Sequence, residues 1–185
     1  MSGLFKHVPN LLTGLRLASA PAVALLLIGD NYRVALGIFA LAGLSDAADG
    51  FLAKRFGFAT RFGRYLDPAA DKLLMLASFF TLTLMGVAPV WLTAIVIGRD
   101  LAIILGVVLV VLLDMPVNVQ PLFVGKLSTA CQIGYVAFAL VLLSFRIEWP
   151  VALAVAGVAT AAATLLSWLA YGQILLMAIW KRGRV

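Results

Sequence analysis

Charged residues, histidine and cysteine are scarce in this sequence. Asp, Glu, Lys and Arg make up 12% of its 185 residues, about half of the roughly 25% found in soluble domains. Apolar residues make up 64%, and the mean hydropathy is +1.10. This composition excludes an ordinary water-soluble globule, a disordered chain and a nucleic-acid-binding domain. The single cysteine, Cys131, excludes a disulfide within the chain.

Long apolar runs are present instead, each close to the ~20 residues that cross a bilayer as a helix. Six such runs cover residues 8–29, 34–53, 67–87, 89–113, 123–145 and 149–180. They leave short connections and no room for a second domain. We therefore expect an all-α polytopic membrane protein with six transmembrane helices, in which residues 1–185 form a single membrane domain.

Basic residues in the connections and at the ends predict the orientation, because Lys and Arg are enriched on the cytoplasmic side. One side carries Lys6, Lys54, Arg55, Arg61, Arg64, Lys181, Arg182 and Arg184, and the other carries Arg33 and Arg146. Both termini should therefore be cytoplasmic. The net charge of +6 indicates contact with anionic lipid headgroups and no nucleic-acid partner.

Several charged residues nevertheless fall inside the expected spans. They are Arg16, Asp46, Asp49, Asp67, Asp71, Lys72, Arg99, Asp100 and Lys126. Exposing all of them to lipid would cost on the order of 20–30 kcal/mol, so we expect them to line a shared polar cavity. A polar cavity inside a helical bundle is by default a functional site.

Four aspartates within this set are spaced for two helix faces. Asp46 and Asp49 are three residues apart, and Asp67 and Asp71 are four apart, so each pair shares one face of a helix. Converging carboxylates repel one another unless cations neutralise them. An all-oxygen ligand set favours Mg²⁺ or Mn²⁺ over zinc, and two such ions are typical of displacement at phosphorus.

Small residues next to the aspartates suit a nucleotide. Gly50 and Ala53 leave room beside the helix, and Lys54 can contact a phosphate. Two other interpretations stay open at this point. The aspartates can cap helices or face water at the interface, and a cation- or proton-coupled transporter also carries buried carboxylates, although it needs neither this glycine pattern nor a basic cytoplasmic loop.

The same residues resemble the signature of the CDP-alcohol phosphotransferases. That signature reads Asp, two residues, Asp-Gly, two residues, Ala-Arg, eight residues, Gly, three residues, Asp, three residues, Asp. Every spacing is kept here, at Asp46, Asp49, Gly50, Ala53, Lys54, Gly63, Asp67 and Asp71. Lys54 replaces the arginine, so a bidentate phosphate contact becomes a point charge unless Arg55 substitutes.

The resemblance extends along most of the chain. Pro9-Asn10, Thr13 and Arg16 resemble the family's opening motif, and residues 66–68 and 70–73 resemble the branch that makes phosphatidylglycerophosphate and cardiolipin. Acceptor-side motifs of that branch match at Arg99, Asp100, Gly125, Lys126, Thr129 and Gln132. Lys126, Thr129 and Gln132 are spaced to share one helix face.

The resemblance implies a six-helix homodimer in a bacterial-type or organellar inner membrane, with its active site open to the cytoplasm. It implies CDP-diacylglycerol as donor, two divalent cations (Mg²⁺ or Mn²⁺) and CMP as leaving group. Asp46, Asp49 and Asp67 would be the principal metal ligands, and Asp71 the general base and a further ligand. Donor-binding residues would be Asp49, Gly50, Ala53, Lys54, Gly63 and Asp67. Acceptor-binding residues would be Arg99, Asp100, Lys126, Thr129 and Gln132.

Two acceptors are compatible with this branch. Glycerol 3-phosphate carries a charge near −2 and calls for several cationic contacts. Members that make phosphatidylglycerophosphate commonly show a second arginine about two turns after the one matching Arg99, where this chain has Gly106. Residues 35–44, the pair 99–100 and residues 120–123 look closer to the eukaryotic-type cardiolipin-forming members. The resemblance thus favours phosphatidylglycerol as acceptor and cardiolipin as product, with glycerol 3-phosphate and phosphatidylglycerophosphate as the alternative.

Overall fold

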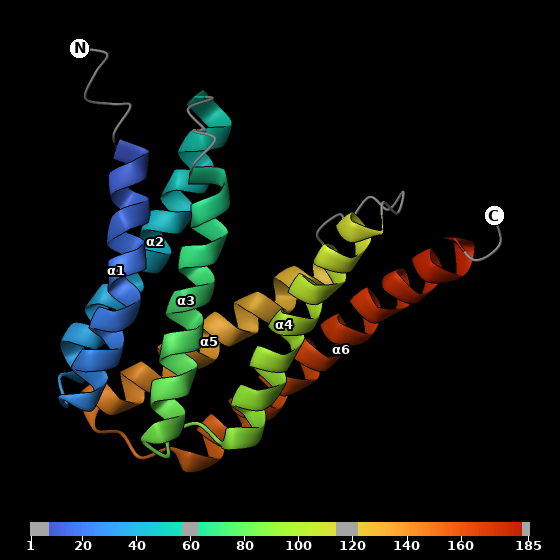
Figure 1. Ribbon diagram of the computed structural model, residues 1–185. Coiled ribbons are helices and arrows are strands. Elements are labelled where there is room, and N and C mark those ends of the chain that lie inside the picture. Colours follow the sequence, from blue (N-terminus) through green and yellow to red (C-terminus); the bar gives the residue numbers. More distant parts are fainter. Residues whose placement is uncertain (1–7, 57–62, 114–121, 183–185) are drawn as a thin grey trace, which may run out of the picture. The chain divides into compact units, whose positions relative to one another are not determined.

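A computed structural model describes residues 8–56, 63–113 and 122–182 of the chain, and every regular element in those ranges is a helix. The six helices are α1 (Val8–Ile28), α2 (Tyr32–Phe56), α3 (Gly63–Leu84), α4 (Val90–Leu112), α5 (Phe123–Phe145) and α6 (Pro150–Arg182) (Figure 1). The all-α expectation is confirmed. Helix bounds lie within four residues of the six predicted runs, and the largest difference is at α3, which begins at Gly63. A helix continues into its polar flank because its hydrogen bonds join backbone groups and do not require apolar side chains.

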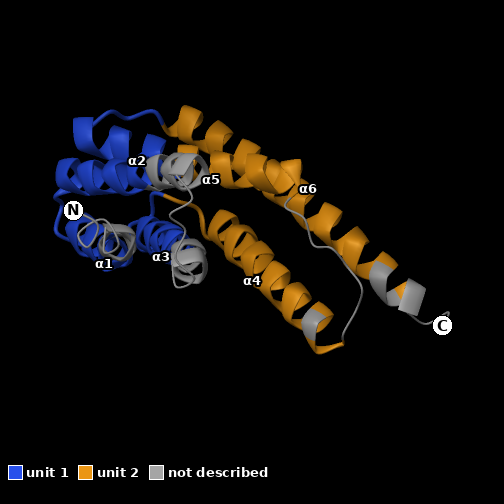
Figure 2. Cartoon of the chain, turned by 90° about the horizontal axis from the view of Figure 1, so that it is seen from above, with its two compact units in different colours: residues 1–87, 136–149 blue, residues 88–135, 150–185 orange. Residues whose placement is uncertain are grey.

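The chain divides into two compact units (Figure 2). Unit 1 comprises residues 1–87 and 136–149, and unit 2 comprises residues 88–135 and 150–185. Helix α5 contributes its second half to unit 1 and its first half to unit 2. Each unit has a packed interior, described below.

Unit 1 is built around α1, which packs against both α2 and α3. Its interior is apolar, with fully buried side chains that include Val23, Leu27, Phe79, Leu82 and Leu140. Val23 and Leu27 are four residues apart, so they form one stripe along α1. The Arg33 Nε donates a hydrogen bond of 3.3 Å to the Ser144 carbonyl oxygen, which ties the start of α2 to the end of α5.

Three helices of unit 1 end in the same kind of cap. A residue with a positive φ lies one or two positions after the end of each helix, with φ of 60° at Asp30, 73° at Gly86 and 55° at Arg146. In each case the next residue's N–H bonds the carbonyl five residues earlier, as Val87 does to Leu82 at 2.9 Å. This is the Schellman pattern, which satisfies carbonyls that a helix end leaves without partners.

Unit 2 contains α4, α6 and the first half of α5. Helix α4 packs against α6, and glycines allow close contact, since a Cβ at Gly98 would lie 3.4 Å from the Trp168 ring. Helix α5 is joined to α6 by buried polar groups, because the Ser128 hydroxyl donates to the Thr164 hydroxyl oxygen at 3.2 Å. Small and hydroxyl-bearing residues at helix contacts are typical of packing in lipid.

Three helices of the described residues are long and apolar enough to cross a membrane, at Val90–Val110, Phe123–Phe145 and Pro150–Met177. Two shorter apolar helical segments lie at Leu17–Ile28 and Tyr32–Ser45. Many large apolar side chains face outward, among them Leu105, Leu112 and Leu169, each about two-thirds exposed or more. A surface of this kind is stable against lipid and costly against water, so these helices indicate an integral membrane protein.

Candidate active site

The eight signature residues lie on two successive helices of unit 1. Helix α2 carries Asp46, Asp49, Gly50, Ala53 and Lys54 in its second half, and helix α3 carries Gly63, Asp67 and Asp71 in its first half. Each aspartate pair is therefore helical, as the three- and four-residue spacings predicted. Both pairs keep the i, i+3 or i, i+4 register, in which the two positions of a pair fall on one helix face.

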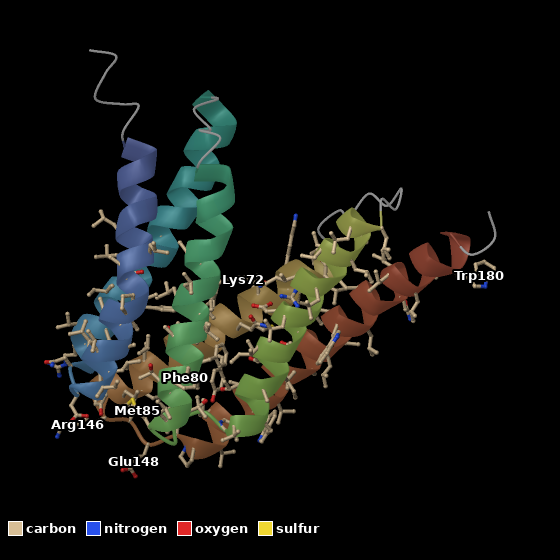
Figure 3. The ribbon with its side chains drawn as sticks, viewed as in Figure 1. Lys72, Phe80, Met85, Arg146, Glu148 and Trp180 are labelled. Atoms are coloured by element: carbon tan, nitrogen blue, oxygen red, sulfur yellow. The ribbon has the colours of Figure 1, made fainter. Side chains whose placement is uncertain are left out.

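Helices α2 and α3 run in opposite directions, so the second half of α2 and the first half of α3, which carry the two aspartate pairs, lie toward the same end of unit 1. Helix α2 leaves the turn at 29–31, and α3 runs back so that its last residues lie near that turn (Figure 1). Figure 3 labels Met85, Arg146 and Glu148 at this end of unit 1, with Lys72 further back along α3. The aspartates belong to the parts of α2 and α3 away from the turn, as a shared site requires.

The structure describes only the helical backbone at seven of the eight signature positions, which are Asp46, Asp49, Gly50, Ala53, Lys54, Gly63 and Asp67. The convergence of the aspartate side chains therefore stays a prediction. Asp71 is described and is half-buried, directly after the fully buried Ala70. Among the side chains that the structure does describe, no three His, Cys, Asp or Glu residues come together. The donor set itself fits Mg²⁺ or Mn²⁺, since the only metal-binding side chains of the signature are carboxylates.

Arg99 is the charged residue that the structure describes in most detail. It lies on α4, is 5% exposed, and its Nη1 forms an ion pair of 2.7 Å with Asp100 Oδ1. Its Nε and Nη2 donate to the Ser167 hydroxyl oxygen on α6 at 3.3 and 3.0 Å. The guanidinium also lies over the Tyr171 ring, 6.0 Å from its centroid. These contacts satisfy a buried cation that would otherwise be very costly.

Tyr171 links this arginine to the beginning of α5. Its hydroxyl oxygen accepts a hydrogen bond of 3.2 Å from the backbone N–H of Leu122, one of the N–H groups that a helix start leaves without an intrahelical partner. Gly125 lies below it in the first turn of α5, where a Cβ would be 3.0 Å from the Tyr171 hydroxyl. Gly125 therefore provides the space that this contact needs.

The predicted acceptor face of α5 has two kinds of residue. Lys126 and Thr129 are exposed, and the Thr129 hydroxyl donates to the Gly125 carbonyl oxygen at 3.1 Å. Gln132 is 3% exposed, and its Nε2 donates to the hydroxyl oxygens of Ser128 and Thr164 at 3.3 and 3.2 Å. The amide nitrogen of Gln132 thus joins α5 to α6, whereas Lys126 is accessible.

Sequence reasoning missed the polar residues of α6. Thr160, Thr164, Ser167 and Tyr171 follow one another at spacings of four, three and four, so they lie along one face of the helix. Ser167 accepts hydrogen bonds from Arg99 on α4, and Tyr171 and Thr164 accept hydrogen bonds from the α5 side. The Thr160 hydroxyl donates to the Cys131 carbonyl oxygen on α5 at 3.3 Å. A polar stripe at helical spacing in an apolar run was the signal that could have identified them.

An apolar groove runs between α4 and α6 next to Arg99. It has a volume of ≈ 110 Å³ and is lined by Ala102, Ile103, Gly106, Val107, Val110, Trp168, Tyr171, Gly172, Ile174 and Leu175. Tyr171 belongs both to this groove and to the Arg99 cluster. Gly106, which lines the groove, occupies the position where members that make phosphatidylglycerophosphate commonly have a second arginine. A Cβ at Gly106 would lie 3.7 Å from Leu175.

Comparison with known proteins identifies relatives over most of the chain. The chain is 36% identical to a cardiolipin synthase (CMP-forming) of Rattus norvegicus over 149 residues, which are 72% of this chain and 49% of the relative. It is 34% identical to the chloroplastic CDP-diacylglycerol–glycerol-3-phosphate 3-phosphatidyltransferase 1 of rice (Oryza sativa subsp. japonica) over 161 residues, 78% of this chain and 49% of the relative.

A bacterial relative is covered more fully. The chain is 36% identical to a cardiolipin synthase (CMP-forming) of Streptomyces coelicolor over 153 residues, 80% of this chain and 70% of the relative. The chain spans about half the length of the rat and rice proteins. The family model for CDP-alcohol phosphatidyltransferase matches residues 6–178, a range that includes every signature and acceptor-side residue described above. The chain belongs to the CDP-alcohol phosphatidyltransferase family.

Proposed function

We propose that this protein is an integral-membrane enzyme that transfers the phosphatidyl group of CDP-diacylglycerol to an alcohol and releases CMP. The observation that carries the proposal is that the eight signature positions on α2 and α3 keep every spacing of the family signature. They lie within a family match over residues 6–178. The names of the rat and rice relatives both describe reactions of this class.

Asp46, Asp49, Asp67 and Asp71 would hold two divalent cations, Mg²⁺ or Mn²⁺. The donor set supports this assignment, since four carboxylates at helical spacing would repel one another strongly without cations. Ions bound there would neutralise charge that develops on the phosphate oxygens. Asp49, Gly50, Ala53, Lys54, Gly63 and Asp67 would bind the cytidine nucleotide end of the donor.

Asp71 would act as the general base. It takes the proton of the acceptor hydroxyl, whose oxygen forms a new bond to the β-phosphorus of the donor while the bond from that phosphorus to the CMP oxygen breaks. CMP leaves with that bond's electron pair. The single histidine, His7, lies outside the described residues, and no histidine is near the signature in sequence, so a carboxylate is the available base.

Phosphatidylglycerol is the acceptor that the residues of unit 2 support best, with cardiolipin as product. Beside Arg99 the chain offers an apolar groove lined by Gly106 and no second arginine at that position, which suits a lipid with one phosphodiester charge and acyl chains. Arg99, Asp100, Lys126, Thr129 and Gln132 would bind this acceptor. Glycerol 3-phosphate is the second candidate, and the name of the rice relative favours it.

All six helices would cross the membrane as one domain, with both termini and the active site on the cytoplasmic side. Three long apolar helices and the eight-to-two distribution of Lys and Arg support this arrangement. The protein would act as a homodimer, as the family resemblance implies.

A reconstituted assay tests the reaction. Purified protein in mixed micelles is given CDP-diacylglycerol, Mg²⁺ or Mn²⁺, and either phosphatidylglycerol or glycerol 3-phosphate, and CMP and lipid products are measured. We expect CMP release that depends on both the metal and an acceptor, with cardiolipin as the main product. Failure to bind any cytidine nucleotide, with or without metal, would contradict the proposal and favour a cation- or proton-coupled transporter built around the same carboxylates.

A further inference from the structure

The buried guanidinium of Arg99 is held from two helices. Asp100, its neighbour on α4, balances its charge at 2.7 Å, and Ser167 on α6 accepts from both Nε and Nη2. Three of the five guanidinium N–H groups are engaged in these contacts within the described part of the chain. The remaining donors give the group the capacity to bind a further oxygen ligand in a fixed direction.

Ser167 and Tyr171 act on this group from one face of α6. They are four residues apart, and they contact the guanidinium in different ways, the Ser167 hydroxyl by hydrogen bonds and the Tyr171 ring from 6.0 Å. Ser167 is fully buried, so its contact is not weakened by competing water. Together they limit the rotation of a long side chain that would otherwise have many rotamers.

Tyr171 also connects Arg99 with the beginning of α5. Its hydroxyl holds the Leu122 N–H at 3.2 Å, four residues before Lys126. Lys126 and Arg99 are the two cations of unit 2 that the proposed acceptor site uses. A single side chain of α6 thus affects the position of both.

We propose that Ser167 and Tyr171 are positioning residues of the acceptor site, which hold Arg99 and the first turn of α5 so that Arg99 and Lys126 bind the phosphate of the acceptor. The inference rests on the proposed function, in which a phosphate-bearing alcohol binds on this side. Neither residue would contact the reacting atoms. Their effect is on the affinity for the acceptor.

The test compares Ser167→Ala and Tyr171→Phe with Arg99→Gln in purified protein. Tyr171→Phe keeps the ring over Arg99 and removes only the hydroxyl that holds Leu122, so it preserves the packing. The matched control is Thr160→Ala, which removes another buried hydroxyl of α6, one that donates to the backbone oxygens of Cys131 and Ala156. All variants are first checked for unfolding temperature and elution volume.

We expect the apparent KM for phosphatidylglycerol to rise about 5–10-fold in Ser167→Ala, which removes the two hydrogen bonds to Arg99, and in Tyr171→Phe, which removes the one to Leu122. The KM for CDP-diacylglycerol should stay within about twofold of the native value, and Thr160→Ala should match the native protein in both. A residue that only stabilises the fold would lower the unfolding temperature and kcat without this acceptor-specific change.

The outcomes separate the inference from the proposal beneath it. If Arg99→Gln raises the acceptor KM while Ser167→Ala and Tyr171→Phe behave like Thr160→Ala, the positioning role is wrong and the acceptor site stands. If Arg99→Gln leaves the acceptor KM unchanged, the acceptor assignment itself is wrong. Equal changes in both KM values for Ser167→Ala and Tyr171→Phe would also overturn the positioning role.

Discussion

Gly125 lies so close to Tyr171 that a Cβ at position 125 would be 3.0 Å from the tyrosine hydroxyl and 3.4 Å from Arg99 Nη2. The sequence indicated Gly125 only as part of a motif with Lys126. The structure gives a physical reason for the glycine. The Tyr171 hydroxyl can accept a hydrogen bond from the Leu122 N–H only while position 125 of α5 carries no side chain.

We predict that Gly125→Ala destabilises the protein by about 1 kcal/mol, because the strain of an added methyl in a packed site exceeds the gain in helix propensity. Gly134→Ala on the same helix is the control, since nothing lies within 4 Å of a Cβ there, and it should be neutral or slightly stabilising. Thermal unfolding in detergent measures both. Equal stability of the two variants would mean that Tyr171 is not held at Gly125.

A second prediction concerns the carboxylates. Asp46→Asn, Asp49→Asn and Asp67→Asn should each lower the rate of CMP release at least ~100-fold while the fold is kept, because each removes a negative ligand from the proposed metal site. Binding of Mn²⁺, followed by its electron paramagnetic resonance signal, should weaken in the same variants. Excess chelator should abolish turnover in the native protein.

Asp30→Asn is the matched control for this series. Asp30 is an aspartate of unit 1 at a positive φ of 60°, a conformation that asparagine also tolerates, and it belongs to the turn between α1 and α2. Its activity and Mn²⁺ binding should equal those of the native protein. Retained activity in all three site variants, or full activity in chelator, would exclude the two-metal proposal.

Much of the helical architecture could be predicted from the sequence. Apolar runs bounded by Gly, Pro and Asp predicted all six helices within four residues at each end, since helix length and the bilayer thickness are linked. The packing of α4 against α6 could not be predicted. Helix α4 is apolar on nearly every face, so its periodicity does not indicate which face meets a neighbour, and the polar stripe of α6 does not indicate which helix that stripe contacts.

The same limit applies to the site. The fixed spacings of Asp46, Asp49, Asp67 and Asp71 identified candidate ligands, because helical register depends on local sequence alone. Ser167 could not be connected to Arg99 in this way, since 68 residues separate them and only the packing of α4 against α6 brings them together. A serine in an apolar helix is as typical of helix packing as of a binding site.

A third prediction concerns membrane topology. The turn at 29–31 and the segment containing Glu148 lie at the same end of unit 1 (Figures 1 and 3), and the charge distribution predicts that this end is outside the cytoplasm. In a background carrying Cys131→Ala, cysteines at Asn31 and Glu148 should react with an impermeant maleimide added from outside. A cysteine at Gly57, outside the described residues, should react only after the cytoplasmic side is opened. Labelling of Asn31 and Gly57 from the same side would contradict the six-span arrangement.

The last prediction concerns the choice of acceptor and centres on Gly106. This residue follows Arg99 by seven positions, so both lie on one face of α4, and it lines the apolar groove between α4 and α6. Gly106→Arg would place a second cation near Arg99 and occupy the groove. We expect cardiolipin formation to fall about tenfold or more, and the ratio of phosphatidylglycerophosphate to cardiolipin to rise when both acceptors are supplied, because a second guanidinium favours a phosphomonoester over a phosphodiester.

Gly106→Leu fills the same space without charge, so it should lower cardiolipin formation and leave the use of glycerol 3-phosphate unchanged. Product analysis with labelled CDP-diacylglycerol measures both ratios. Cardiolipin formation at the native rate in both variants would show that the groove does not take part in acceptor binding. Efficient phosphatidylglycerophosphate synthesis by the native protein would identify glycerol 3-phosphate as the acceptor.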